Sequence, residues 1–533
     1  MNVDVSSLTD NTSDLKDIIQ SLSISYRNLE QVKQKKQFRI DFLEERIRLL
    51  QKELFGRKTE KQSKVDQKQL LLFDEDQMDD PEKDDLPEKI TIPEHSRKKR
   101  GRKPLPEELP RIEIVHDINE EEKICGCGSE LSHIGDDTSE KLEIIPAKVL
   151  VIRHIRKKYA CKNCEGVEDD GPTVKIAPLP PQIIPKGIAT PGLLAHIIVS
   201  KFEDALPFYR QEKILRRMGI DLPRSTLCNW AVKVADKIEP IISLLYDEVR
   251  SGPLINIDET PVQVLKEPDR SNTSKSYMWV YRGGNPDQPV LIYQYQPTRS
   301  GQVPLSFLNE YKGYVQTDGY SGYDALGRKD GVELVGCWAH ARRKFVEVIS
   351  AKSGKKKKGV ADKAMNFIGS LYHIEKQARE NNLEPDAVYR LRQEKAKPIL
   401  EKFHPWLLLK SEITPPKGLL GKAINYTLKY WDRLIRYIED GRLRPDNNLV
   451  ENAIRPFVIG RKNWLFSGSP NGAKASSDLY SLVETAKTNG LKPYEYFRYL
   501  LEKLPFAETT RDYKKLLPQN VDPALLKFDY PQV

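Results

Sequence analysis

The sequence predicts a multidomain α/β protein in which a mixed sheet is flanked by helices and interrupted by a long α-helical insertion. Three observations predict this class. The chain has 533 residues, more than one hydrophobic core usually organises. Two apolar, strand-like runs, at 254–257 and 314–317, each end at an aspartate. Helix-favouring sequence then fills about 341–441, too long a stretch to be a simple loop.

Residues 1–55 are predicted to form a coiled coil. Apolar residues recur in steps of three and four, with one phase shift, at Leu15, Ile18, Leu22, Leu29, Val32, Ile40, Leu43, Ile47, Leu50 and Leu54. This spacing is typical of a coiled coil with a stutter, so we expect the segment to join copies of the chain into a homo-oligomer. An amphipathic hairpin that folds back on its own chain is the alternative.

Residues 56–104 are predicted to be a charged, disordered linker that ends in a basic cluster. Arg100, Arg102 and Lys103 lie in this cluster, which is similar to an AT-hook, an extended arginine-containing arm that enters a narrow minor groove. A linker that contacts phosphates without sequence preference is the alternative. Both interpretations point to DNA.

Residues 105–175 are predicted to form a small zinc-ribbon β domain. Four of the six cysteines fall here in two pairs: Cys125, Cys127, Cys161 and Cys164. Four thiolates so spaced suit one tetrahedral, structural Zn²⁺. The first pair has one intervening residue instead of the usual two, so His133 or His154 could replace a displaced cysteine. A disulfide framework is disfavoured in a cytoplasmic chain with so few cysteines.

Residues 176–250 are predicted to be helical and to include a candidate helix-turn-helix. A turn near 219–223 leads into a second helix, for which Ser225 is the candidate N-cap. Arg224 stands where such a motif would meet phosphate. A plain helical hairpin that supports the core is the alternative.

Three carboxylates stand out among the chain's 77 Asp and Glu residues: Asp258, Asp318 and Glu451. Each aspartate ends a strand-like run, and a helix-start signature beginning at Asp446 places Glu451 in the first turn of a helix. Oxygen ligands so arranged would hold two Mg²⁺ or Mn²⁺ ions about 3.5–4 Å apart for phosphoryl transfer. The alternative is two turn aspartates and a glutamate that favours the helix dipole. Asp446, and more remotely Glu439, are runners-up for the third ligand.

Four blocks carry a resemblance to a known family: INIDETPVQVL, VQTDGYSGY, GCWAHARRKF and ENAIRPFVIGRKNWLFSGS. They resemble the signature blocks of the insertion-sequence-66 family of bacterial transposases, the TnpC-type DDE enzymes, and the similarity extends from the coil to the carboxyl end. The resemblance implies an RNase H-like core over residues 251–486, with catalytic metals on Asp258, Asp318 and Glu451. It also implies that companion proteins encoded by the same element take part. Glu259 should point to the opposite face of its strand and is left out of the set.

The segment from Cys337 to His340 resembles a Cys-x-x-His element that follows the second aspartate in several insertion-bearing DDE transposases. The resemblance implies that His340 lies near the scissile phosphate or orders the active site. A satisfied structural histidine is the alternative. The next residues, Arg342, Arg343 and Lys344, would suit DNA phosphate.

The block after Glu451 adds further candidate DNA contacts. Arg455 is four residues from Glu451 and would orient the carboxylate or meet DNA. Arg461 and Lys462 are the basic candidates that follow. Trp464 would stack on an exposed base, or it packs in the core, as large aromatic side chains more often do.

Composition narrows the class of protein. A formal net charge of +9 permits nucleic-acid binding, no apolar run is long enough to span a bilayer, and the first residues lack a signal-peptide pattern. We therefore expect a cytoplasmic, DNA-associated bacterial protein that does not bind membranes. Residues 487–533 are predicted to be a small helical region without chemistry of its own.

Taken with the resemblance, these features predict a DNA transposase that binds its transposon ends and catalyses metal-dependent strand cleavage and transfer into target DNA. Two alternatives stay open. One is a catalytically inactive, zinc-containing DNA-binding regulator of transposition. The other is a simple metal-dependent nuclease.

Overall fold

The computed structural model describes residues 149–160, 174–351 and 359–527, together with scattered helical residues between 19 and 47. The chain divides into two units, one of residues 76–178 and the other of the remaining residues. Several predicted features lie outside the described residues: Arg100, Arg102, Lys103, Cys125, Cys127, Cys161 and Cys164. The basic cluster and the zinc ribbon therefore stay predictions. Of the smaller unit, the structure describes an antiparallel pair, β1 (Lys158–Ala160) and β2 (Val174–Ile176).

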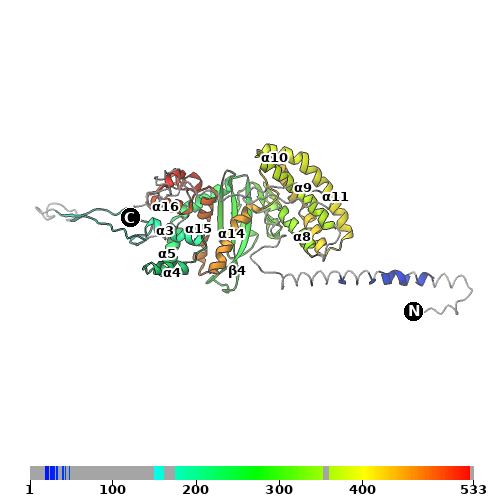
Figure 1. The fold of residues 1–533 in the computed structure, drawn as a ribbon, viewed down its shortest axis with the longest axis horizontal. Coiled ribbons are helices and arrows are strands. Elements are labelled where there is room, and N and C mark those ends of the chain that lie inside the picture. The colour runs from blue at the N-terminus through cyan, green and yellow to red at the C-terminus, as the bar shows by residue number, and fades with distance from the viewer. Residues whose placement is uncertain are drawn as a thin grey trace, which may run out of the picture. The chain divides into compact units, whose positions relative to one another are not determined.

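The larger unit is built on a six-stranded mixed sheet with the order β5–β4–β3–β6–β7 and with β8 pairing with β3 (Figure 1). The strands are β3 (Leu254–Val264), β4 (Lys275–Asn285), β5 (Gln288–Gln296), β6 (Gly313–Gln316), β7 (Val332–Val335) and β8 (Phe466–Ser467). The first three form an antiparallel meander, whereas β6 and β7 run parallel to β3. The predicted mixed sheet flanked by helices is confirmed.

The expectation that a strand ends at Asp258 is wrong. β3 continues to Val264, and Asp258 pairs with Val280 in the middle of the antiparallel ladder to β4. The parallel partner β6, however, accompanies β3 only as far as Asn256. Asp258 therefore lies just beyond the end of the parallel ladder, where the sheet opens on that side.

Helices cover the meander. Before the sheet come α3 (Pro191–Phe202), α4 (Phe208–Arg217), α5 (Arg224–Lys237) and α6 (Glu239–Ser251), and after it come α14 (Asn448–Trp464), α15 (Pro470–Thr488) and α16 (Pro493–Lys503). α15 is joined to β5 through hydroxyl groups, since Ser481 accepts the Tyr293 N–H at 2.8 Å and Thr485 accepts the Leu291 N–H at 3.1 Å.

The predicted N-cap at Ser225 is wrong, because α5 already begins at Arg224. Pro223 occupies the cap position with φ −64° and ψ 146°, an extended conformation that proline favours, so the helix starts one residue earlier. Arg224 is exposed at this first position.

The predicted helical insertion lies between β7 and α14, and its helices gather at one edge of the sheet (Figure 1). They are α8 (Trp338–Ser350), α9 (Val360–Glu380), α10 (Pro385–Leu391), α11 (Lys397–Ile413), α12 (Leu419–Lys429) and α13 (Trp431–Ile435), with a π-helical turn at Arg392–Ala396. They enclose a core of their own that includes Trp338, Phe403 and Trp431. The two ends of the insertion meet, because the Trp338 N–H donates to the Pro445 carbonyl at 2.8 Å.

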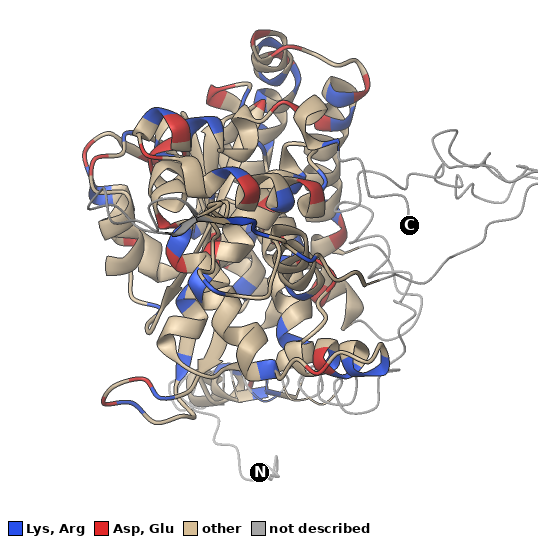
Figure 2. Cartoon of the chain, turned by 90° about the vertical axis from the view of Figure 1, so that its left-hand side faces the viewer, with Lys and Arg blue, Asp and Glu red and all other residues tan. Residues whose placement is uncertain are grey.

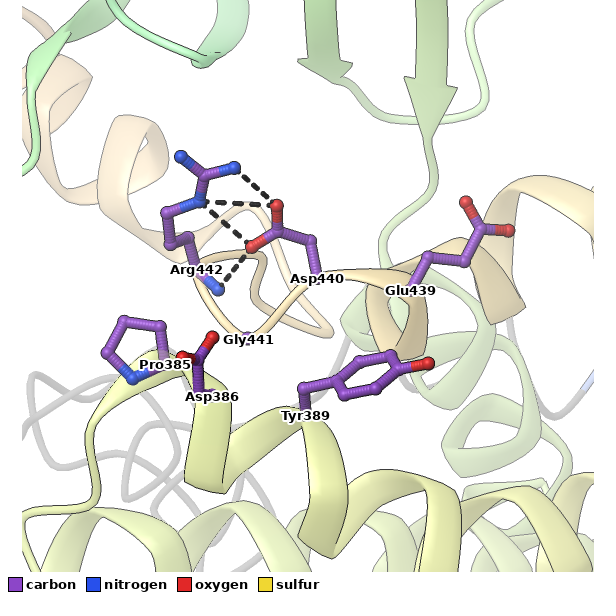
Figure 3. A pocket seen from close by; sticks show the side chains of 7 residues that line it. All are labelled: Pro385, Asp386, Tyr389, Glu439, Asp440, Gly441 and Arg442. Carbon is purple, nitrogen blue, oxygen red and sulfur yellow. Dashed lines mark hydrogen bonds and ion pairs between the residues drawn. The ribbon is translucent and has the colours of Figure 1, made fainter.

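A polar surface hollow of about 400 Å³ lies between the start of α10 and the segment that returns from the insertion (Figure 3). Arg442 in this hollow is paired with Asp440. Gly441 allows the two segments to approach, since a Cβ there would lie 1.8 Å from the Pro385 carbonyl oxygen. These contacts give the hollow a structural role.

Arg392 ties the returning segment to the insertion. Its side chain is 2% exposed, forms a two-pronged ion pair with Glu375, and donates to the carbonyls of Tyr437, Asp440 and Leu443 at 2.8 Å each.

Arg392→Met should therefore lower the free energy of unfolding by about 3 kcal/mol, because it leaves the Glu375 carboxylate and three carbonyl groups without their partner. Urea denaturation measures the change. Arg442→Met is the matched control and should cost less than about 1 kcal/mol, because the pair of Arg442 with Asp440 is largely exposed on the arginine side. Equal losses in the two variants would contradict the structural role given to Arg392.

Candidate metal centre

The fold brings the three predicted carboxylates together beyond the end of the parallel ladder between β3 and β6. Asp258 lies on β3, Asp318 follows the neighbouring strand β6, and Glu451 lies in the first turn of α14, which packs against β3. Burial raises the pKa of Asp258 well above its usual range, and the charges of Glu259, Glu451 and Asp318 raise it further. Negative charge is thus concentrated where the parallel pairing of β3 with β6 ends.

Glu451 is held in a mostly buried position without a full set of hydrogen bonds. Burial raises the pKa of Glu451, Asp446 and Asp318 add to this, and Arg343 and Arg455 oppose it. Its Oε1 atom is buried and has no hydrogen-bond partner. Arg343 lies 3.9 Å from Oε2. A buried carboxylate oxygen left without a donor, beside two further acids, fits a site for a divalent cation.

His340 faces the same carboxylate. Its Nδ1 atom lies 3.7 Å from Glu451 Oε1 and has no hydrogen-bond partner. Burial lowers the pKa of His340 to about 4, with a further lowering by the charge of Arg343. The imidazole is therefore neutral at pH 7 and keeps a free ring nitrogen.

Three buried amide side chains fix the strands and the helix that carry the carboxylates, and the sequence reasoning missed them. Asn256 Nδ2 donates at 2.9 Å both to Gln316 Oε1 and to Asn447 Oδ1. Asn447 Nδ2 donates to the Ile257 carbonyl at 2.9 Å, and its N–H donates to Cys337 Sγ at 3.3 Å. Two of the amides stand two residues before an aspartate of the centre, and the third stands four before Glu451.

The amide of Gln316 extends this cluster to the insertion. Its Nε2 donates to the carbonyls of Gly336 and Arg444, which flank the insertion, at 3.2 and 2.8 Å. The signal available in the sequence was polar residues inside apolar strand runs. Buried amides persist in a core only when they are hydrogen-bonded, so their presence predicts a network but not its partners.

Asn447→Ala should lower the free energy of unfolding by about 2 kcal/mol, because it removes two buried hydrogen bonds and leaves polar groups of β3 unsatisfied. Denaturant titration of the metal-free protein measures this. The control is Asn381→Ala at the exposed end of α9, which should change stability by less than about 0.5 kcal/mol. A loss at Asn447 no larger than that at Asn381 would count against the amide network.

Glu259 has partners of its own. Arg299 forms an ion pair with Glu259 Oε1 at 2.5 Å, and the Tyr323 hydroxyl donates to Oε2. The Arg299 guanidinium also lies over the Tyr320 ring, 3.8 Å from its centroid. Glu259 is therefore engaged by Arg299 and Tyr323.

The candidate DNA-contacting residues differ in their surroundings. Lys462 is exposed, like Arg224, whereas burial lowers the pKa of Arg342. The Lys344 ammonium lies 4.6 Å from the centroid of the Tyr426 ring. In the view of Figure 2, basic and acidic residues alternate over the helices, and neither sign covers a whole face. Among the described residues, this view shows no broad basic face.

Two other candidates are engaged within the protein. Arg461 Nη1 donates to Thr260 Oγ1 at 3.0 Å and to the Pro261 carbonyl, which joins α14 to β3. The Trp464 ring packs edge-on against Phe457 with centroids 5.4 Å apart, and the Lys201 ammonium lies 5.4 Å from its centroid. These contacts favour the packing alternative for Trp464.

Across the described residues, the helices are too short or too polar to cross a membrane.

Comparisons with known proteins match four consecutive parts of the chain. A family model described as "Transposase IS66 family" matches residues 186–475, and "IS66 C-terminal element" matches 481–519. "Transposase C of IS166 homeodomain" matches 42–114. "Zinc-finger binding domain of transposase IS66" matches 122–165, a span that contains all four paired cysteines.

Curated relatives come from Sinorhizobium fredii (strain NBRC 101917 / NGR234). The uncharacterized protein y4jD is 35% identical over 432 residues, which cover 78% of this chain and 81% of the relative. The uncharacterized protein y4qI is 31% identical over 442 residues, 80% of this chain and 79% of the relative. The similarity thus extends over most of both chains.

Proposed function

The chain belongs to the IS66 family of transposases, and from this premise we propose that it binds the ends of its insertion sequence and catalyses metal-dependent DNA cleavage and strand transfer. The observation that carries the proposal is the proximity of Asp258, Asp318 and Glu451 beyond the end of the β3–β6 ladder, with a buried Glu451 oxygen that lacks a hydrogen-bond donor.

The sheet supports an RNase H-like core for the catalytic domain. Three antiparallel strands are followed by two strands parallel to the first, in the order β5–β4–β3–β6–β7. An acid on β3, an acid just after the parallel strand β6 and an acid on a later helix support the DDE arrangement that the resemblance implies. The helical insertion separates the second acid from the third.

Asp258, Asp318 and Glu451 would hold two Mg²⁺ or Mn²⁺ ions, which when bound activate the nucleophile and stabilise the leaving oxygen. The chain's own residues orient the reaction. The amide cluster of Asn256, Gln316 and Asn447 holds β3, β6 and α14 in register, so the three carboxylates keep a fixed spacing.

Neutral His340 would accept a proton from the attacking hydroxyl at one ring nitrogen, or donate its ring N–H to the scissile phosphate, and Arg343 would supply positive charge beside it. Water attacks the phosphate at the transposon end first, and a DNA 3′-hydroxyl leaves. That 3′-hydroxyl then attacks target DNA in line.

Assembly on paired ends would rest on the amino-terminal segment. The described residues between 19 and 47 are helical, and their apolar side chains are exposed. Large apolar residues in this exposed set are Ile19, Leu22, Leu29, Val32, Ile40, Leu43 and Ile47. An uncovered apolar series of this spacing supports a coiled coil with a second copy of the chain.

The remaining domains would grip DNA. The zinc-finger family match over 122–165 supports a structural Zn²⁺ on Cys125, Cys127, Cys161 and Cys164. The basic cluster near Arg102, Arg224 at the start of α5, and Lys462 are proposed phosphate contacts. DNA cleavage and strand transfer would take place in the bacterial cytoplasm, together with companion proteins encoded by the same element.

The test is end cleavage by the full chain in Mg²⁺, Mn²⁺ or Ca²⁺, on DNA that carries the element's own ends and in the presence of the element's companion proteins. Mg²⁺ and Mn²⁺ should support cleavage at the ends and joining to target DNA, whereas Ca²⁺ should support binding alone. Cleavage without joining would identify a simple nuclease. Firm end binding without any cleavage would identify a regulator.

A further inference from the structure

A second group of potential metal ligands lies beside the carboxylate centre. One donor atom each from Cys337, His340 and Glu451 lie within 4.8 Å of one another. Cys337 and His340 come from the start of α8, and Glu451 comes from the first turn of α14. The group therefore combines a sulfur, a nitrogen and an oxygen, unlike the all-oxygen set of the two aspartates and Glu451.

Two of these donors are buried and unsatisfied. His340 Nδ1 and Glu451 Oε1 lack hydrogen-bond partners and face each other at 3.7 Å. Cys337 is 2% exposed, and its Sγ atom accepts backbone N–H groups, that of Asn447 at 3.3 Å and that of His340. Three potential ligand atoms that converge without a side-chain hydrogen bond between them are the arrangement expected of a cation site.

The ligand types select the metal. Mg²⁺ and Ca²⁺ prefer oxygen ligands, whereas thiolate, imidazole and carboxylate together suit Zn²⁺ and chemically similar ions such as Co²⁺. Tetrahedral Zn²⁺ with bonds of about 2.0–2.3 Å places its ligand atoms about 3.4 Å apart. Side-chain shifts of roughly 1–1.5 Å would bring the three atoms to that spacing.

We propose that Cys337, His340 and Glu451 form a transition-metal site that binds Zn²⁺. When Zn²⁺ is bound, Glu451 no longer shares a metal ion with the two aspartates, and cleavage is inhibited. Water fills the fourth position, as in zinc sites with three protein ligands. The inhibitory half rests on the proposed function, whereas metal binding itself does not.

The surrounding charges permit such an ion. Thiolate and carboxylate together neutralise a divalent cation, and Asp318 and Asp446 lie near enough to Glu451 to add negative potential. The positive charge of Arg343 opposes binding of the ion. However, its side chain is 40% exposed and its ion pair with Glu451 Oε2 is long, at 3.9 Å, so the guanidinium can turn to solvent. The cost is the loss of one loose ion pair.

Cobalt spectroscopy on the full chain tests binding without any need for activity. Wild type, Cys337→Ser and Cys228→Ser are titrated with Co²⁺ and compared by difference spectra. Cys228 is the matched control, a free cysteine exposed on α5. All three proteins keep the paired cysteines at 125–164, so their signal cancels. We expect a thiolate-to-cobalt band that only Cys337→Ser lacks.

His340→Gln is the second variant and guards against misfolding of Cys337→Ser. It should keep the fold, as its melting temperature will show, and weaken Co²⁺ binding at this site by about 10–100-fold. Identical difference spectra for wild type and Cys337→Ser would overturn the site. So would a band that disappears in Cys228→Ser.

The proposed inhibition is tested by measuring end cleavage at constant Mg²⁺ and increasing Zn²⁺. Each cleavage rate is divided by the rate of the same protein without zinc. Cys337→Ser should need about tenfold more Zn²⁺ or more for half-inhibition. Equal sensitivity of wild type and Cys337→Ser would overturn inhibition through this site. Absence of cleavage by wild type at any zinc concentration would count against the proposed function, and the cobalt spectra would still decide the metal site.

Discussion

Asp258→Asn should lower the rate of metal-dependent end cleavage by about 10³-fold or more, with affinity for the DNA ends unchanged. Asparagine keeps the size of the side chain and removes the charge that a metal requires. The same change should raise the melting temperature of the metal-free protein at neutral pH. Burial and neighbouring acids raise the pKa of Asp258 in the folded protein. Above the pKa that Asp258 has in the unfolded chain, keeping its carboxylate in the fold therefore lowers the free energy of unfolding. Asparagine carries no charge and removes this cost.

Single-turnover cleavage in Mg²⁺, end binding in Ca²⁺ and thermal melting of the metal-free protein measure the three effects. Asp287→Asn is the control, an exposed aspartate in the turn between β4 and β5, and it should change none of them. A variant at Asp258 that kept more than about a tenth of the wild-type rate would remove this residue from the metal ligands.

Glu451→Gln should likewise abolish cleavage with end binding retained, whereas Asp446→Asn should leave substantial activity. Asp446 is almost fully buried, and its Oδ1 accepts the Asn448 N–H at 3.3 Å at the start of α14. An asparagine side chain keeps an oxygen that can accept this N–H, so Asp446→Asn loses little. Glu451 instead presents an unpartnered oxygen toward the centre.

Cleavage rates of the two variants in Mg²⁺, compared at equal end binding, decide the third ligand. Loss of activity in Asp446→Asn with activity kept in Glu451→Gln would move that ligand to Asp446. Glu439, the remoter candidate, lines the surface hollow beside α10 in Figure 3.

Local patterns in the sequence were enough to predict the strands that carry Asp258 and Asp318 and the helix start that carries Glu451. Each signal lies within about ten residues: an apolar run before an acid, or Asp-Asn-Asn before a helix. The insertion was also predictable, because helix-favouring sequence that is too long for a loop must build its own core, as Trp338 and Phe403 do.

Long-range partners could not be predicted in this way. Nothing near Asn256 indicates that its amide meets Asn447, which lies 191 positions later. The continuation of β3 beyond Asp258 depends on its pairing with β4, and the attachment of Arg461 to Thr260 depends on how α14 lies on that strand. Hydrophobic periodicity specifies which face of an element is buried, but not which polar group it meets there.

The separation of Asn256 and Asn447 along the chain also determines when, during synthesis, the proposed metal centre can be completed. At translation rates of about 5–20 residues per second, roughly 10–40 s separate the emergence of the first amide from that of the second. Once Asp318 has emerged as well, the ribosome-bound chain has both aspartates but neither Glu451 nor the hydrogen bonds that anchor α14. The order of synthesis thus keeps the three carboxylates from meeting until Glu451 has been made.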